Sequence, residues 1–155
     1  MSDDPTTVQS PLDQALDAAT PDQPVRVRGP GWLADIETRQ VGPVGVVIER
    51  LRVEGRHGDL AERASAVAEG LRPQGERLLP VEVDPGLGGA VLRTRPEDMQ
   101  RGHFYEVGLD ATGAELSRHR RTPGGRVREP FALTREELGR IVEGLGQVVG
   151  GKEEE

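Results

Sequence analysis

The feature that most constrains the fold is an amphipathic segment near the end of the chain, residues 133–149. Thr134 and Glu137 have the spacing of a capping box, in which each side chain bonds a backbone N–H of the other residue. Apolar side chains then recur at helical spacing, at Leu138, Ile141, Val142, Leu145 and Val149. Such a stripe is typical of a helix that packs one face on a sheet or on another helix. The segment therefore predicts a C-terminal helix that needs a covering layer.

Upstream of this helix the pattern changes to the two-residue period of β-strands. Strands are expected at residues 25–28, 32–37, 46–53, 78–83, 90–94, 105–109, 115–121 and 126–131. The alternation within 46–53 falls out of phase, so we expect a bulge near Glu49. A second amphipathic helix is predicted to begin at Asp59 and to end at Arg72-Pro73. The chain is thus predicted to be α+β, with a mainly antiparallel sheet of about six to eight strands and two amphipathic helices packed on it.

The N-terminal segment, residues 1–23, carries five aspartates and neither Lys nor Arg. Two interpretations stay open. One is a flexible acidic arm, and the other is a short third helix that starts at Ser10-Pro11 and forms only when it docks. We expect a single α+β domain over residues 24–149 and a disordered tail over residues 150–155.

The composition limits the classes of function. The absence of cysteine excludes disulfides and thiolate chemistry, and it fits a reducing cytoplasm. No apolar run approaches the roughly 20 residues that span a bilayer, so we expect a cytoplasmic protein without membrane association. The net charge of −7 and the aromatic content of 3% argue against nucleic acid as a partner.

No group of residues has the spacing of a reactive centre. His57, His103 and His119 are far apart and form no metal-ligand pair, and no Gly-x-Ser-x-Gly occurs. The sequence therefore assigns no catalytic residue, no metal ligand and no cofactor. The alternative is an enzyme or small-ligand-binding protein whose polar site assembles from scattered residues such as Asp35, Glu37, His103 and Glu106.

The most distinctive charged feature is a predicted hairpin at residues 117–128, which contains no acid. Its cationic candidates for partner binding are Arg118, His119, Arg120, Arg121, Arg126 and Arg128. If the turn at 122–125 pairs Arg121 with Arg126, then His119 lies opposite Arg128 on the same face. One interpretation is a solvated edge hairpin whose charge discourages edge-to-edge pairing. The other is a contact surface for an acidic partner, with the chain's own N-terminal arm as one candidate.

Trp32 follows a Gly-Pro-Gly turn at the start of a predicted strand. As the sole tryptophan of the chain it is expected to anchor the core, with a role in partner binding as the alternative.

The order of elements resembles that of the class I type III secretion chaperones and their relatives. The resembling residues are Ile36, Val44-Gly-Val-Val-Ile48, Leu109–Arg118 and Phe131-Ala-Leu-Thr-Arg-Glu-Glu-Leu138. Members of that family are small acidic α+β proteins of bacteria, usually homodimers, that hold a partner chain extended across their surface. The resemblance implies a non-enzymatic protein-binding or adaptor module, chaperone-like and able to form a homodimer. The predicted hairpin over Leu78–Thr94 is an addition that the family pattern does not contain.

A module of this kind is expected to take its partner in one of two ways. A segment can add to an exposed strand edge by β-augmentation, or it can dock into an apolar groove between helices.

Overall fold

The computed structural model describes residues 8–20, 22–56, 58–84, 86 and 88–150. Over these residues the helices are α1 (Gln9–Asp17), α2 (Leu60–Gly70) and α3 (Arg135–Gly150), with short 3₁₀ turns η1 (Pro73–Gly75) and η2 (Pro96–Asp98). The first strands are β1 (Val25–Gly29), β2 (Trp32–Val41), β3 (Gly45–Glu54) and β4 (Leu78–Asp84). The remaining strands are β5 (Gly89–Thr94), β6 (His103–Asp110), β7 (Gly113–Thr122), β8 (Gly125–Glu129) and β9 (Phe131–Thr134).

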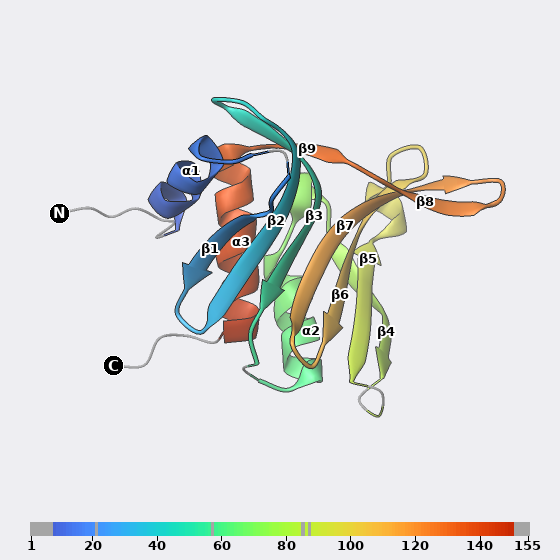
Figure 1. Ribbon diagram of the computed structural model, residues 1–155. Helices are drawn as coiled ribbons and strands as arrows, with labels where there is room; N and C mark the ends of the chain where they lie inside the picture. The colour runs from blue at the N-terminus through green and yellow to red at the C-terminus, as the bar shows by residue number, and fades with distance from the viewer. Residues whose placement is uncertain (1–7, 21, 57, 85, 87, 151–155) are drawn as a thin grey trace.

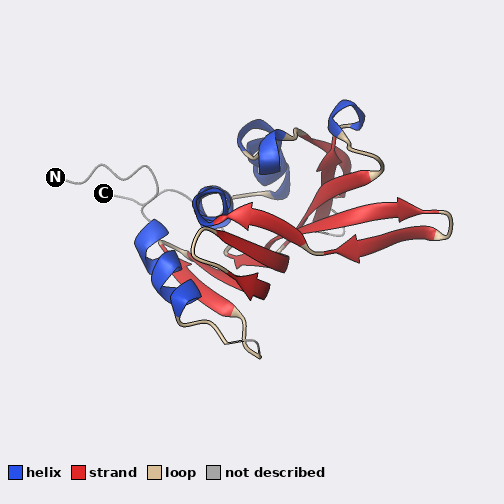
Figure 2. Ribbon diagram, turned by 90° about the horizontal axis from the view of Figure 1, so that it is seen from above, coloured by secondary structure: helices blue, strands red, loops and turns tan. Residues whose placement is uncertain are grey.

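The strands form one antiparallel sheet in the order β1-β2-β3-β7-β6-β5-β4. β8 pairs with the outer half of β7, and β9 pairs with the first half of β3. The helices lie on one face of the sheet, which leaves the other face open (Figures 1 and 2). This architecture confirms the predicted α+β class with its antiparallel sheet, and it includes the third, N-terminal helix.

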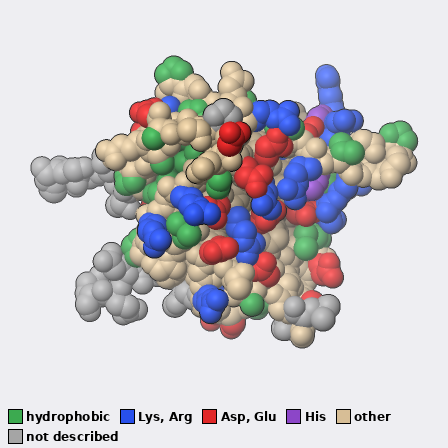
Figure 3. Space-filling model, viewed as in Figure 1, with side chains coloured by type: hydrophobic (Ala, Val, Ile, Leu, Met, Phe, Trp, Pro, Cys, Tyr) green, Lys and Arg blue, Asp and Glu red, His purple; other side chains and the backbone are tan. Residues whose placement is uncertain are grey.

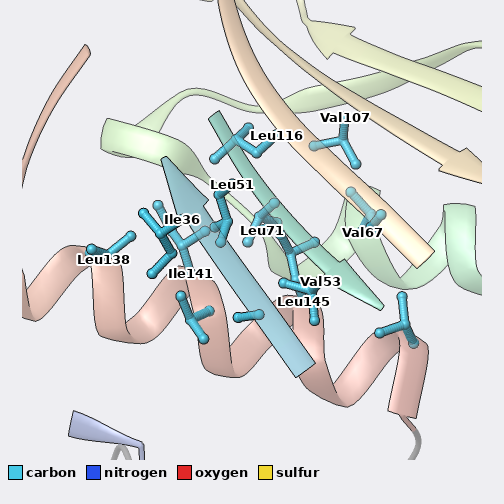
Figure 4. Packing of buried hydrophobic residues seen from close by; sticks show 14 of the residues in the cluster. Ile36, Leu51, Val53, Val67, Leu71, Val107, Leu116, Leu138, Ile141 and Leu145 are labelled. Atoms are coloured by element: carbon cyan, nitrogen blue, oxygen red, sulfur yellow. The ribbon is translucent and has the colours of Figure 1, made fainter. Parts of the chain in front are cut away.

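The core lies between the sheet and its helices. Ile36, Leu51 and Val53 face the apolar stripe of α3, where Leu138 and Leu145 are fully buried (Figure 4). Helix α3, which spans 16 residues, packs on β2 and β3 on the β1 side of the sheet. Helix α2 packs on β4 and β5 at the other side. The sequence-predicted stripe is therefore the face that packs on the sheet.

A bulge in β3 keeps its apolar residues on one face, as predicted. The β2–β3 ladder shifts register within residues 37–40, so Glu49 on β3 and Arg39 on β2 have no cross-strand partner. These two residues form an ion pair at 2.6 Å. The shift places Val46 and Ile48 on the same buried side as the residues that follow the bulge.

The helix caps follow the sequence in part. Asp59 accepts from the backbone N–H of Glu62 at 2.8 Å, and Thr134 accepts from that of Glu137 at 3.0 Å. The return bond of the predicted capping box is absent, because the Glu137 carboxylate instead accepts from the backbone N–H of Gln74 at 2.6 Å. Gln74 has a left-handed backbone, with φ of 51°, and Tyr105 donates its hydroxyl to the Gln74 side chain. The Glu137 side chain therefore links η1 to α3 and does not close the predicted capping box.

The predicted strand over residues 126–131 is two strands. β8 pairs with β7, whereas β9 crosses to β3 and places Phe131 opposite Ile48. Pro130 separates them, because proline has no N–H to contribute to a ladder. The β7–β8 hairpin consequently projects from the body of the sheet (Figure 1).

Trp32 fills a slot made by glycines. Its ring is 6% exposed, and a Cβ on Gly29, Gly146 or Gly150 would lie less than 3.0 Å from ring atoms. Two of these glycines belong to α3, where glycine costs about 1 kcal/mol in helix propensity relative to alanine. The slot explains the glycines at positions 146 and 150 of α3.

The N-terminal segment contains a docked helix over its described part. Leu12 and Leu16 of α1 are buried, while Asp13 and Asp17 contact Arg135 of α3 at 3.4 and 2.8 Å. The rest of the expected flexible arm (1–7 and 21) and residues 151–155 of the expected tail lie outside the described residues. Gly150, the first residue of that expected tail, is instead the last residue of α3.

Candidate partner-binding surface

The open face of the sheet is a lattice of charged side chains (Figure 3). One row takes a residue from each of seven strands, in the order Glu82, Val91, Gly108, Glu115, Arg52, Asp35 and Arg26. Neighbouring opposite charges pair across the strands, as in Arg26–Asp35 at 2.7 Å and Arg93–Glu106 at 2.8 Å. The more exposed of these pairs contribute about 0–1 kcal/mol each. Glu106 is the exception, since its side chain is 15% exposed.

A hollow of about 360 Å³ lies on this face over Gly108 of β6. A Cβ on Gly108 would meet nothing within 4 Å, which shows that the hollow opens where this side chain is missing. Its acidic lining comprises Glu82, Asp84, Glu106, Asp110 and Glu115, against two arginines, Arg52 and Arg128. The part of the hollow next to β4 is therefore acidic.

The arginine hairpin has the register that the sequence predicted. Arg121 pairs with Arg126 and His119 with Arg128, so these four residues lie on one face. The close like charges are compensated by carboxylates of the sheet: Glu106 bonds Arg126, and Glu115 lies 3.5 Å from Arg128. Most of the positive charge of this face is thus matched within the chain.

The seven candidate binding residues divide between interior and surface. Trp32 and His119 are each 6% exposed, and Arg118 covers the Tyr105 ring at 4.6 Å with a side chain that is 15% exposed. The four that remain at the surface are Arg120, Arg121, Arg126 and Arg128. Arg121 lies over the ring of Phe104, and within the described residues it makes no ion pair.

The described part of the N-terminal segment does not reach this hairpin. Helix α1 packs against β1 and α3, on the side of the molecule away from β8 (Figure 1). Its acids, Asp13 and Asp17, are engaged by Arg135. Helix α1 is therefore not the acidic occupant of the hairpin.

A serine–histidine pair lies at the base of the hairpin, and sequence reasoning missed it. Ser117 Oγ is 2.9 Å from His119 Nε2, and the imidazole stacks on Phe104 with ring centroids 5.5 Å apart. Burial lowers the pKa of His119. The nearby carboxylate of Glu106 opposes this shift, and the positive charges of Arg126 and Arg128 add to it. The ring is neutral near pH 7, yet Nδ1 has no hydrogen-bond partner in the described part of the chain.

A nucleophilic serine needs a base that a third group orients, as in a triad. The Ser117–His119 pair lacks that group, since no carboxylate among the described residues bonds Nδ1. The spacing of Ser117 and His119, two apart on one strand face, is the signal that could have revealed the pair. We interpret it as a structural contact under Phe104.

The scattered polar residues of the enzyme alternative fall into separate places: Asp35 and Glu37 line one hollow of about 290 Å³ together with Arg26, Arg50 and Arg52, whereas His103 and Glu106 lie outside it. Asp35 and Glu37 bond arginines on neighbouring strands, and His103 Nδ1 lies 2.6 Å from Glu129. Among these candidates Glu106 alone lines the hollow over Gly108. Over the described ranges no three His, Asp or Glu side chains are grouped to hold a metal ion.

The exposed apolar side chains gather on β4. Leu79, Val81 and Val83 are 44%, 52% and 40% exposed, and they are three of the five large apolar side chains exposed over the described ranges. The other two lie elsewhere: Val44 in the turn between β2 and β3, and Val127 on β8. β4 pairs with β5 along one side, and no described strand pairs with its other side. We call Leu79, Val81 and Val83 the β4 strip; it crosses the sheet edge, because Leu79 lies opposite Arg93 on the open face and Val83 opposite the buried Ala90 on the helix face, with Val81 at the register shift between them.

The backbone of this edge offers few hydrogen-bonding groups. Arg95 donates its N–H to the carbonyl of Arg77 at 2.8 Å, and the alternation of antiparallel bonds then turns Pro80 toward the free edge. Proline has no N–H to offer there, and a register shift between Pro80 and Glu82 leaves Val81 unpaired. Both features discourage continuous pairing of edges. Side chains, together with the outward backbone of Val83, must therefore carry most of the recognition.

An apolar groove between α2 and α3 is the second candidate surface. It measures about 300 Å³, and Gly70 and Gly144 open it where side chains are missing. Its leucines, Leu71 and Leu145, are 6% and 0% exposed, and its accessible apolar surface comes from the half-buried Val148 and the small side chain of Ala66. The groove thus offers less exposed apolar surface than the β4 strip.

Comparison of the chain with protein-family models, with curated proteins and with solved structures found no match. None of the helices in the described ranges has the length and apolar character needed to cross a membrane.

Proposed function

We propose that this protein is a non-enzymatic protein-binding module that holds an extended segment of a partner along β4. The observation that carries this proposal is the β4 strip, an exposed apolar surface on a sheet edge that no described element pairs with. The opposite edge differs, because α1 packs against β1 and Val25 and Val27 are buried there.

The strip is large enough to matter for binding. Full burial of a Val or Leu side chain contributes about 1.5–3 kcal/mol, and these three are roughly half exposed. Covering them therefore contributes about 1 kcal/mol each, or about 3 kcal/mol in total. This corresponds to about a hundredfold in Kd.

The proposed role has the form expected from the chaperone resemblance, in which a partner is kept extended on the surface. The strip lies on β4, within the hairpin that the family pattern lacks, so the binding edge proposed here is this chain's own. The absence of cysteine fits a reducing compartment, and we place the activity in the cytoplasm.

Recovery of partners from native lysate by tagged protein, with quantification by mass spectrometry, tests the proposal. The variant Leu79→Ser with Val83→Ser should lose partners that the wild type recovers. The matched control is Val44→Ser with Val127→Ser, which removes exposed apolar surface away from β4 and should recover them in full. Equal recovery by both double variants, or repeated recovery of the protein alone, would contradict the proposal.

A second candidate is binding of an acidic partner at the arginine hairpin. The observation that favours it is the exposed Arg121, which has no carboxylate partner within the described residues. Its neighbour Arg120 is also exposed and lies 3.7 Å from the Glu129 carboxylate. Reversal of these two charges tests this candidate without touching the ion pairs of Arg126 and Arg128.

A further inference from the structure

We infer that the segment bound at β4 carries basic side chains on the face that adjoins the open face of the sheet, alternating with apolar ones. This inference rests on the proposed function and names the chemistry of the partner. It is carried by the position of Glu82 and Asp84 on β4, next to the β4 strip.

The register fixes the face to which these acids belong. Glu82 lies opposite Val91 and Asp84 opposite Gly89, in rows that continue across the open face to Gly108 and Asp110. Glu82 is exposed and forms no ion pair with a described residue. A strand added beside β4 would lie about 4.8 Å away, so its side chains on this face would stand directly beside the two carboxylates.

The hollow behind these acids strengthens the preference for positive charge. Three of the carboxylates that line it, Glu106, Asp110 and Glu115, already pair with arginines. The negative charge beside an added segment is that of Glu82 and Asp84, at the outer rim on β4. A guanidinium or ammonium on the added segment therefore meets a local excess of negative charge. An acidic side chain at the same position would be repelled.

The same charges argue against the chain's own segments as occupants. Residues 1–7 contain two aspartates and no basic residue, and residues 151–155 contain three glutamates and one lysine. Two-fold pairing of β4 with β4 of a second copy would bring Glu82 and Asp84 beside the same acids. β1 has an alternating Val-Arg-Val-Arg sequence at residues 25–28, so head-to-tail association of copies is the competing outcome to be measured.

The test uses two labelled decapeptides, one alternating valine with arginine and the other alternating valine with glutamate, with binding followed by fluorescence anisotropy. The wild-type protein should bind the arginine peptide more tightly than the glutamate peptide, and its affinity for the arginine peptide should fall as salt is raised. The variant Glu82→Lys with Asp84→Lys should bind the arginine peptide roughly tenfold more weakly, since two exposed attractions become repulsions. The neutral variant Glu82→Gln with Asp84→Asn should show a smaller loss in the same direction.

The matched control is Glu69→Lys with Glu136→Lys, which changes the net charge by the same amount on exposed helix positions and should leave binding unchanged. Equal losses in both lysine variants, or no binding by wild type, would overturn the inference. So would self-association that excludes the peptide, measured by light scattering. If Leu79→Ser with Val83→Ser abolishes partner recovery while the Glu82 and Asp84 variants recover partners normally, the proposed function stands and this inference fails. If the serine variant recovers partners normally, the proposed function itself fails.

Discussion

Replacement of Gly146 by alanine should destabilise the protein although it removes a glycine from a helix. A Cβ at this position would overlap the Trp32 ring, at less than 3.0 Å from ring atoms. Overpacking of a core costs about 1–3 kcal/mol, and the overlap with three ring atoms places this case near the upper end. The gain in helix propensity offsets about 1 kcal/mol, so the free energy of unfolding should fall by about 2 kcal/mol.

Gly144, on the same helix, supplies the control. Its Cβ would lie 3.6 Å from Leu71 Cδ1, an ordinary contact, so Gly144→Ala should be stabilising by up to about 1 kcal/mol. Urea unfolding of both variants, followed by fluorescence of the sole tryptophan, measures the difference. In thermal unfolding, the midpoint of Gly146→Ala should lie about 4–8 °C below that of the wild type. A Gly146→Ala protein as stable as the wild type would refute the account of the slot.

Three further outcomes are expected. Because the pKa of His119 is lowered in the folded state, protonation favours unfolding, and stability should fall as pH drops from about 6.5 through the folded pKa. His119→Gln should reduce this dependence in urea titrations at pH 7.5 and 5.5, and an unchanged difference would contradict it. Thr134→Ala should cost about 1 kcal/mol, since the Glu137 N–H loses its acceptor; an unaltered urea midpoint would count against this cap. Arg120→Glu with Arg121→Glu should weaken binding of a glutamate-rich peptide at low salt, at a stability cost of about 1 kcal/mol because the Arg120–Glu129 pair and the Arg121–Phe104 contact are lost. Unchanged affinity over a salt series would remove the hairpin from consideration.

The local elements of the fold were predictable because their signals lie in short stretches. The stripe of α3, the Asp59 cap, the bulge at Glu49 and the Arg121–Arg126 register are each encoded within a few residues of one another. Features that join distant residues were not predictable. The hydrogen bond from Gln74 to Glu137 connects η1 with α3 across 63 positions, and no local sequence pattern predicts it.

The sequence predicted that the candidate site would be an exposed strand edge or a helix groove, but not which strand would supply it. An exposed strand edge was expected, but residues 78–83 are an almost continuous apolar run, which is typical of a buried strand. Pro80 was the available signal, because proline within a strand indicates an edge. The exposure of Val81 could not be inferred, since it depends on the bulge and on β4 being the last strand of the sheet.

The most direct test of the β4 edge is site-specific photocrosslinking in the native cell. A photoreactive phenylalanine is placed at position 81, at position 44 as an exposed control, and at position 148 in the groove between α2 and α3. The β4 account predicts a partner crosslinked at position 81, through a peptide with alternating basic and apolar residues, and little product at the other two. A partner captured mainly at position 148, or equally at position 44, would contradict it.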